Sequence, residues 1–280
     1  MTERQQHRQR RGAGVAAGVL CICLAGSGCV AESGAAVDDS RGGDAVKVVR
    51  RAADALAGAR SSKARTSMEM ATGGTRVTIR GEGVYDFRRQ VGRLKVLLPQ
   101  DPAGAPAQRP IVELLAPGAL FMKNRGAGVP ADKWVRVETR SLSDGNLVTG
   151  GATDPYAAAE VLRGARTATY VGEEEVAGAA VRHYRGTADL RVAAREASDG
   201  NADALAAAAK GFATDEVPFD VYLDDEGRIR KVRHRFSFVN GQQQSAVAVA
   251  STTLLYDFGT PVDVRLPDDD DIYAGKIAEE

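Results

Sequence analysis

The stretch from Pro218 to Leu266 constrains the fold most strongly. Within Phe219–Leu223, apolar and polar residues alternate, and this period of two is typical of a strand with one buried face. The turn sequences Asp225–Gly227 and Asn240–Gly241 then separate two further β-biased runs. Three strands joined by short turns form an antiparallel meander, and its apolar face has to be covered by another part of the chain.

The rest of the chain supplies more strands and a few helices. An apolar stripe at helical spacing predicts a helix over Asp44–Arg60, and shorter helices are expected over Leu190–Glu196 and Ala202–Phe212. About ten strands are expected in all, and Gly81 and Gly83 indicate either sharp curvature or the close approach of another group to the sheet. The sequence therefore predicts an α+β fold with a strongly curved antiparallel β-sheet, a half-barrel, whose concave face is covered by helices.

The amino terminus has the plan of an export signal. Residues 1–28 begin with several arginines, continue with a short apolar segment over Ala13–Ala25, and end in small residues. The sequence Leu24–Cys29 resembles a bacterial lipobox, in which cleavage precedes a cysteine that then carries diacylglycerol. Gly26 departs from that pattern, since an aliphatic residue is usual there. We expect lipidation at Cys29, which would supply the two acyl chains that stable anchoring requires.

The cysteines support this interpretation. Cys21, Cys23 and Cys29 are the three in the chain, so Cys29 has no partner for a disulfide in the exported part. The alternative is ordinary secretion with an unused thiol. Residues 29–43 are small, polar and rich in glycine, which predicts a flexible tether, and residues 44–280 are expected to form one domain.

Composition argues against nucleic-acid binding. Removing four of 37 basic and one of 37 acidic side chains with the signal leaves a net charge near −3. There is then no basic excess to attract phosphates, and aromatic residues make up only 5% of the chain, too few for base-stacking platforms.

No pattern of catalytic or metal-binding residues stands out. His183 and His234 lie on expected strands without cysteine or carboxylate partners at ligand spacing. The run Asp268–Asp271 lacks the ordered spacing of a calcium loop, which favours a solvated turn. We therefore expect no enzyme activity, no metal and no cofactor.

Several segments together resemble a known family. They are Val181–Thr187, Phe219–Ile229 and Tyr256–Val262, which accompany the lipobox and the amino-terminal helix. Over Asp44–Ile272 the chain resembles actinobacterial lipoproteins of the LppX/LprAFG type, which are relatives of the periplasmic carrier LolA. The resemblance implies an incomplete, strongly curved barrel with helices on its concave side. It also implies an apolar cavity between them that takes the acyl chains of a lipid or glycolipid.

The apolar faces of the expected helix and sheet supply the expected cavity lining. Small residues along the helix would fill little of the space beneath it, which favours a void, while a solid core of interdigitated side chains is the alternative. Trp134, the single tryptophan, is either an anchor in the core or rim, or a platform for a ligand. The expected lining consists of Val48, Val49, Leu56, Val77, Ile79, Tyr85, Val96, Trp134, Val221, Phe236 and Phe238.

These expectations define one function and two rivals. The first is a lipoprotein on the outer face of the cytoplasmic membrane, tethered through Cys29, that holds or transports a lipid or other apolar molecule. The second is a sensor or assembly module of the same fold that contacts a protein partner and has no ligand. The third, an extracellular hydrolase, is disfavoured because no site for it is evident.

Overall fold

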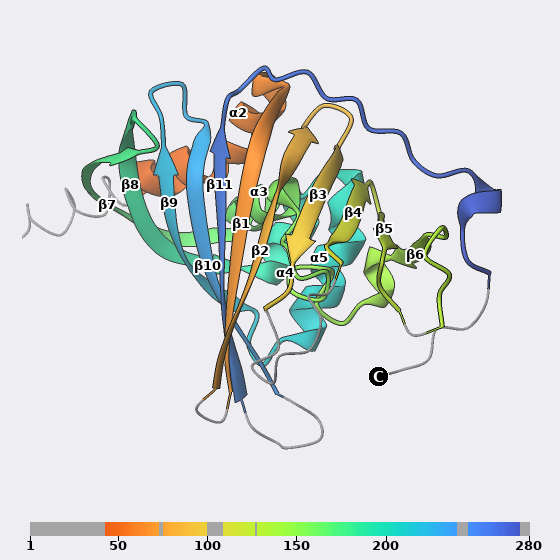
Figure 1. The fold of residues 1–280 in the computed structure, drawn as a ribbon. Coiled ribbons are helices and arrows are strands. Elements are labelled where there is room, and N and C mark those ends of the chain that lie inside the picture. Colours follow the sequence, from red (N-terminus) through yellow and green to blue (C-terminus); the bar gives the residue numbers. More distant parts are fainter. Residues whose placement is uncertain (1–42, 73–74, 100–108, 127, 240–245, 275–280) are drawn as a thin grey trace, which may run out of the picture.

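One large antiparallel sheet organises the molecule. The computed structural model describes residues 43–72, 75–99, 109–126, 128–239 and 246–274 (Figure 1). The expected signal, the tether up to residue 42 and the turns Gly73–Gly74 and Asn240–Gly241 lie outside these residues. The sheet has eleven strands, in the order β6-β5-β4-β3-β2-β1-β11-β10-β9-β8-β7, with β6 and β7 at its two edges.

The sheet consists of two meanders joined by the first and last strands. Strands β1 to β6 follow one another in space and in sequence, as do β7 to β11, and β1 pairs with β11. The strands are β1 (Ser61–Thr72), β2 (Thr75–Asp86), β3 (Val91–Leu97), β4 (Ile111–Ala116), β5 (Ala119–Lys123), β6 (Val135–Glu138), β7 (Ala165–Val176), β8 (Ala179–Asp189), β9 (Glu216–Leu223), β10 (Ile229–Val239) and β11 (Ala246–Tyr256).

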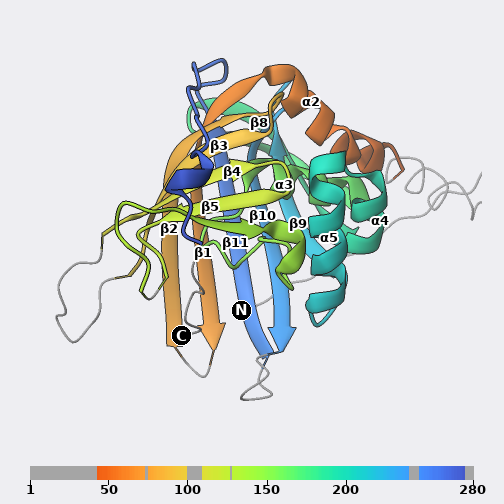
Figure 2. The same ribbon diagram turned by 90° about the vertical axis from the view of Figure 1, so that its right-hand side faces the viewer.

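The helices lie together on the concave side of the sheet (Figures 1 and 2). Asp154 fixes the start of α3 because its carboxylate accepts hydrogen bonds from the backbone N–H groups of Tyr156 (2.7 Å) and Ala157 (3.1 Å). Asp189 caps α4 in the same way. Within the described ranges, no helix combines the length and the apolar character needed to cross a bilayer. The helices are residues 43–50, α2 (Ala52–Ala59), α3 (Pro155–Val161), α4 (Leu190–Glu196) and α5 (Asp199–Gly211), with the 3₁₀ turns η1 (Thr139–Ser141), η2 (Leu162–Gly164) and η3 (Asp269–Asp271).

Most predicted elements occur close to where the sequence placed them. The meander from Pro218 onward is β9, β10 and β11, and α4 has its expected bounds. The expected helix over Asp44–Arg60 is divided at Arg51, although Arg51 still donates to the carbonyl of Lys47 (3.3 Å). It ends at Arg60, whose left-handed backbone (φ 69°) turns the chain into β1.

Side chains of different size meet between the sheet and the helices on its concave side, which we call the cover. The sheet contributes large buried residues, among them Met68, Tyr85, Leu94, Phe219 and Phe236. The facing helices contribute ten buried alanines beside larger side chains such as Leu56, Tyr156 and Leu190. The buried alanines are Ala45, Ala52, Ala53, Ala157, Ala158, Ala159, Ala193, Ala204, Ala208 and Ala209.

Strand pairing at Gly83 leaves no room for a side chain. Gly83 faces Leu94 across the β2–β3 pair, and a Cβ at this position would overlap the carbonyl oxygen of Arg93. We expect Gly83→Ala to lower the free energy of unfolding by roughly 2–3 kcal/mol, because β2 and β3 would have to separate locally. Gly58→Ala is the control, since a Cβ in that exposed part of α2 meets nothing within 4 Å. The control should gain about 0.5–1 kcal/mol from helix propensity. Urea unfolding measures both changes, and equal effects would contradict the assignment of close approach at Gly83.

Candidate functional site: the covered concave face

The structure brings most of the expected lining residues together. Seven are buried in the main core, with exposed fractions of 8% or less: Val49, Leu56, Ile79, Tyr85, Val96, Val221 and Phe236. Val48 and Val77 are partly buried and pack against the same core. The backbone of Phe238 belongs to β10, but its side chain lies outside the described atoms.

Trp134 does not lie with these residues. It is partly buried in a second cluster, where its neighbours include Phe121 and Val264. Its backbone N–H donates to the carbonyl of Asp271 (2.9 Å), and it bridges to Ile272. Trp134 therefore anchors the segment after β11, which corresponds to the first of the two roles considered for it.

In this conformation the cover fills the space that the sequence assigned to a ligand. Side chains with so little accessible surface leave no room for a guest against the seven buried lining residues. Besides the helices, residues 142–153 contribute to the filling, and we call them the plug loop. Its Leu147 and Ala152 are fully buried, and a Cβ at Gly81 of β2 would lie 3.2 Å from that of Ala152. The plug loop therefore rests on the middle of the concave face.

One carboxylate shapes the plug loop. Asp144 accepts hydrogen bonds from the backbone N–H groups of Asn146 (3.1 Å), Val148 (2.8 Å) and Thr149 (2.5 Å). The amide oxygen of Asn146 in turn accepts from the N–H of Gly150 (3.1 Å). The loop thus satisfies its own backbone groups and needs few hydrogen bonds from the sheet.

The concave face beneath the plug loop carries polar side chains. Thr66 of β1 and Thr253 of β11 face one another across the central strand pair, and His234 of β10 faces Ser251. Ser251 has a partner, Thr153 of the plug loop, with 2.5 Å between the two hydroxyl oxygens. Other polar atoms of this face are buried without a hydrogen-bond partner among the described residues, which is costly in an apolar core. They are Ser62 Oγ, Thr66 Oγ1, Thr253 Oγ1 and His234 Nε2.

Glu113 of β4 is the most unusual group of the site. Its carboxyl group is fully buried, and neither oxygen has a hydrogen-bond partner in the described structure. Burial raises the pKa of Glu113 to about 8, although the charge of Arg125 opposes the shift. Gly150 of the plug loop lies over it, since a Cβ there would be 3.1 Å from Oε1. Glu113 is therefore predominantly uncharged at neutral pH and can donate a hydrogen bond.

Two neighbouring groups also have shifted pKa values. Burial raises the pKa of Asp154 to about 6, against hydrogen bonds from Ala157, Tyr156 and Tyr85 that favour the ionised form. Burial lowers the pKa of His234 to about 3, so its imidazole is neutral. Glu113 and His234 are therefore both predominantly uncharged at neutral pH.

Polar contacts join the elements of the cover to one another. Arg163 contacts Glu160 of α3 (3.0 Å) and Asp54 of α2 (2.7 Å), and Glu160 also accepts from the N–H of Ser198, which precedes α5 (2.7 Å). These contacts link α2, α3 and the start of α5 without involving the sheet. The cover can therefore retain its internal structure if part of it moves relative to the strands.

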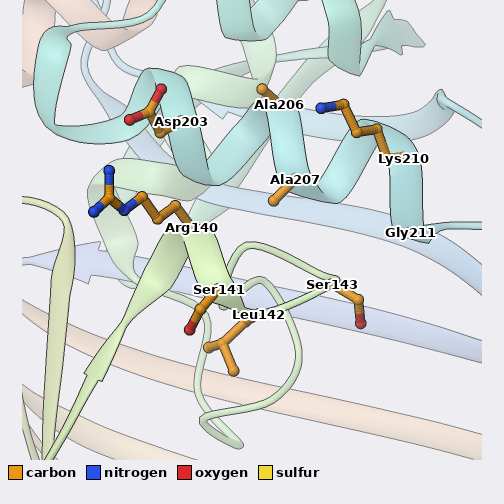
Figure 3. A pocket seen from close by; sticks show the side chains of 9 residues that line it. All are labelled: Arg140, Ser141, Leu142, Ser143, Asp203, Ala206, Ala207, Lys210 and Gly211. Atoms are coloured by element: carbon orange, nitrogen blue, oxygen red, sulfur yellow. The ribbon is translucent and has the colours of Figure 1, made fainter.

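A surface groove marks the seam between α5 and the start of the plug loop. Its volume is about 640 Å³, and Arg140, Asp203 and Lys210 are among the side chains that line it (Figure 3). At two points the backbones approach closely, because a Cβ at Gly145 would overlap the carbonyl oxygen of Ala204 and one at Gly211 that of Ser143. Glycine thus allows the seam to close.

Folding gives His183 carboxylate partners that its sequence position did not reveal. Its Nε2 lies 2.9 Å from Asp220, and its Nδ1 lies 2.8 Å from Glu174, an ion-pair distance without hydrogen-bond geometry. These partners come from neighbouring strands, so spacing along the sequence could not indicate them. Asp220 also accepts from Arg185 (2.8 Å) and Arg235 (2.9 Å), so these contacts form an interstrand network on the convex side.

Sequence reasoning also missed the polar groups of the concave face. Glu113 gave a usable signal, because it is a charged residue at an inward position of the otherwise apolar strand β4. Thr66 and Thr253 gave none, since threonine is common on both faces of strands. The segment Leu142–Gly151 has no helical or strand periodicity, and nothing in its sequence indicated that it enters the concavity.

Comparisons with known proteins give matches among solved structures alone. No family model matches the chain, and no curated protein matches it. LppX from Mycobacterium tuberculosis has 10% identity and a TM-score of 0.48, with 80% of this chain and 99% of that chain covered. LprF from Mycobacterium bovis has 15% identity and a TM-score of 0.41, with 80% and 97% covered. A putative outer membrane lipoprotein-sorting protein domain from Vibrio parahaemolyticus has 10% identity and a TM-score of 0.32, with 79% and 94% covered. Solved structures of the expected lipoprotein type are thus among those to which this chain is similar.

The raised pKa of Glu113 predicts a loss of stability with rising pH. The folded protein keeps a proton that the unfolded chain has already released, so the stabilisation present at low pH is lost as pH approaches 8. Between about pH 6.5 and 8, the free energy of unfolding should fall by up to about 1.4 kcal/mol per pH unit. The shifts of Asp154 and His234 act mainly below this window.

Urea unfolding across this window tests the prediction. Glu113→Gln should flatten the slope, because the variant has no proton to lose at this position. Glu82→Gln, at an exposed position of β2, should keep the slope of the parent. A slope that persists in Glu113→Gln would show that another group is responsible.

Proposed function

We propose that the protein is an extracytoplasmic lipoprotein that holds an amphiphilic lipid between its curved sheet and a displaceable cover. One observation carries this proposal. The concave face combines large apolar side chains with buried polar atoms that have no partner among the described residues, and the cover opposite it includes ten buried alanines. A guest that displaces part of the cover would replace its apolar contacts and supply the missing hydrogen bonds.

The energetics of apolar burial support a guest with a hydrocarbon chain. Helix α5 contributes Leu205, Ala208 and Ala209 to the core and is followed by Phe212, which stacks on Phe236 at 5.0 Å between ring centroids. An alanine side chain buries little apolar area. Moving α5 away from the sheet would therefore lose less free energy of burial at each alanine than at a leucine. Each CH₂ group of an incoming acyl chain would return about 0.8 kcal/mol. Burial of an acyl chain of ordinary length would therefore offset the free energy lost when a segment such as α5 is displaced.

The polar groups support a guest with an uncharged head. Thr66 and Thr253 can each donate and accept a hydrogen bond, and protonated Glu113 can donate one. Hydroxyl groups of a glycolipid or of a neutral lipid would satisfy them. A phosphate or carboxylate held there would lose its hydration without gaining a buried cation as compensation. We therefore favour a lipid or glycolipid whose buried part is neutral.

The proposed location rests on the amino terminus. Cys29 lies outside the described residues, and its acylation remains a proposal based on the signal plan and the lipobox. Diacylglycerol at Cys29 would hold the domain on the outer face of the cytoplasmic membrane, with residues 30–42 as the tether. We propose no catalytic step.

The filled concave face favours a second candidate function. If the cover does not move, the same fold would act as a tethered sensor or assembly module that contacts a protein in the envelope. Purified protein distinguishes the two candidates, because a carrier isolated from its source cells under native conditions should contain lipid, and a module of this kind should not.

Replacing the two facing threonines separates ligand binding from stability. Thr66→Val together with Thr253→Val removes partnerless hydroxyl groups while nearly keeping their shape. The empty double variant should be as stable as the parent or more stable by about 1–2 kcal/mol, because buried unsatisfied groups are lost. The same variant should retain less lipid in native mass spectrometry, because the head of the guest loses its partners.

The control for this experiment is Thr252→Val, at the neighbouring position on the convex face. It should leave lipid retention unchanged. Unchanged lipid retention in the double variant would contradict a role of the two threonines in lipid binding. The absence of bound lipid from the parent and from all variants would contradict carriage altogether.

Cys29→Ala tests the anchor. We expect the variant to leave the membrane fraction, because the proposed lipid attachment is lost, while the folded domain is unaffected. Fractionation of cells expressing the parent and the variant measures this. Equal membrane association of both would contradict anchoring through Cys29.

A further inference from the structure

The convex face of the sheet carries a cluster of basic side chains on neighbouring strands. Arg65 of β1 faces Glu82 of β2, which in turn faces Lys95 of β3. In the next row, Ser67 faces Arg80 on one side and Thr252 on the other. We define the basic face as Arg65, Arg80, Arg93, Lys95, Lys231 and Arg233.

The cations of the basic face differ from others on the same side of the sheet. Lys63 pairs with Asp257 (2.9 Å), and Arg185 and Arg235 pair with Asp220. Across the described ranges, no member of the basic face lies within 4.0 Å of a carboxylate oxygen. Glu82, between Arg65 and Lys95, and Asp220, opposite Arg233, offset part of this charge without forming close ion pairs, and the face keeps an excess of cations.

A shallow groove runs through the basic face and has an apolar floor. Its volume is about 350 Å³, and its lining includes Arg65, Arg80 and Lys95 together with Leu97 and Leu254. Leu97 is 46% exposed, one of the few large apolar side chains exposed to this extent in the described structure. A ring of cations around an apolar strip is complementary to a surface on which anionic groups lie next to hydrocarbon.

The charge of the basic face does not follow from composition. Without its signal the chain carries a slight negative net charge, so the clustering of cations over β1, β2, β3 and β10 is a property of this face. Large fields of one sign over a surface attract partners of opposite charge. The pattern therefore indicates an extended anionic partner.

We propose that the basic face docks the domain on the surface of an anionic phospholipid bilayer, with Leu97 entering the interfacial region. Lysine and arginine near such a surface contribute about 1 kcal/mol each. The inference uses the proposed anchor for its location only. Thirteen residues separate Cys29 from residue 43, which is up to about 45 Å of extended chain, so a tethered domain could turn this face towards the bilayer.

Vesicle sedimentation tests the proposal without the lipid anchor. The full chain with Cys29→Ala is mixed with vesicles of phosphatidylglycerol and phosphatidylcholine in equal parts, or with vesicles of phosphatidylcholine alone. Binding should require phosphatidylglycerol and weaken as salt is raised. In this background, Arg65→Gln with Lys95→Gln should lower the partition coefficient about 25-fold, which is about 5-fold for each cation removed. Leu97→Ser should lower it by a smaller factor and leave the salt dependence unchanged.

The matched control removes the same charge from the cover. Arg195→Gln with Lys210→Gln changes two exposed cations of α4 and α5, on the opposite side of the sheet, and should leave binding unchanged. Residues 1–28 are common to all these chains, so any binding that they add cancels in the difference between the partition coefficients of the two double variants. Equal binding by the two double variants, or equal binding to both kinds of vesicle, would overturn the proposal. Neither result depends on acylation at Cys29 or on a bound lipid, so failure here is distinguishable from failure of the proposed function.

Discussion

The pairing of β1 with β11 holds the structure together, because it joins two separate meanders into one sheet. Each meander alone would be a twisted ribbon with an exposed apolar face. Joined at the centre, they form a curved surface whose inner side cannot remain in water. The connections that run from β6 to β7 and from β8 to β9 therefore carry the plug loop, α3, α4 and α5 onto that side. The cover is a consequence of the sheet, and so is any site between the two.

The way in which the cover fills the concavity decides what the site can do. Alanine-rich helices approach the strands closely, and glycine at Gly145 and Gly211 allows α5 to meet the backbone of the plug loop. The result is a filled interior to which the cover contributes alanines together with larger side chains such as Leu56 and Leu147. Polar contacts through Arg163 hold the cover elements to one another. These contacts tie the cover together independently of the polar atoms on the sheet beneath it, which have no partner among the described residues.

The sequence predicts the parts of this structure that depend on local periodicity. The meander after Pro218, helix α4 and the inward positions of residues such as Ile79, Val96 and Val221 follow from the alternation of side chains along strands and the repeat of helices. The plug loop did not follow, because its place depends on contacts between residues distant in the chain, such as Thr153 with Ser251. Trp134 was ambiguous for the same reason, since it precedes β6 and its contacts depend on the docking of the segment after β11.

The two faces of the sheet are encoded in interleaved residues. In β1, Ala64, Thr66 and Met68 point inward, while Arg65 and Ser67 point outward, and β2 repeats the arrangement with Gly81 beside Arg80. Because successive side chains alternate, a slip of one residue in the register would place cations in the core and apolar groups in solvent. The strict register of β1 with both neighbours therefore preserves the apolar inner face and the basic outer face together. If lipid exchange takes place at a bilayer, a sheet with these two faces can hold the domain against the membrane with one while the other remains available to the guest.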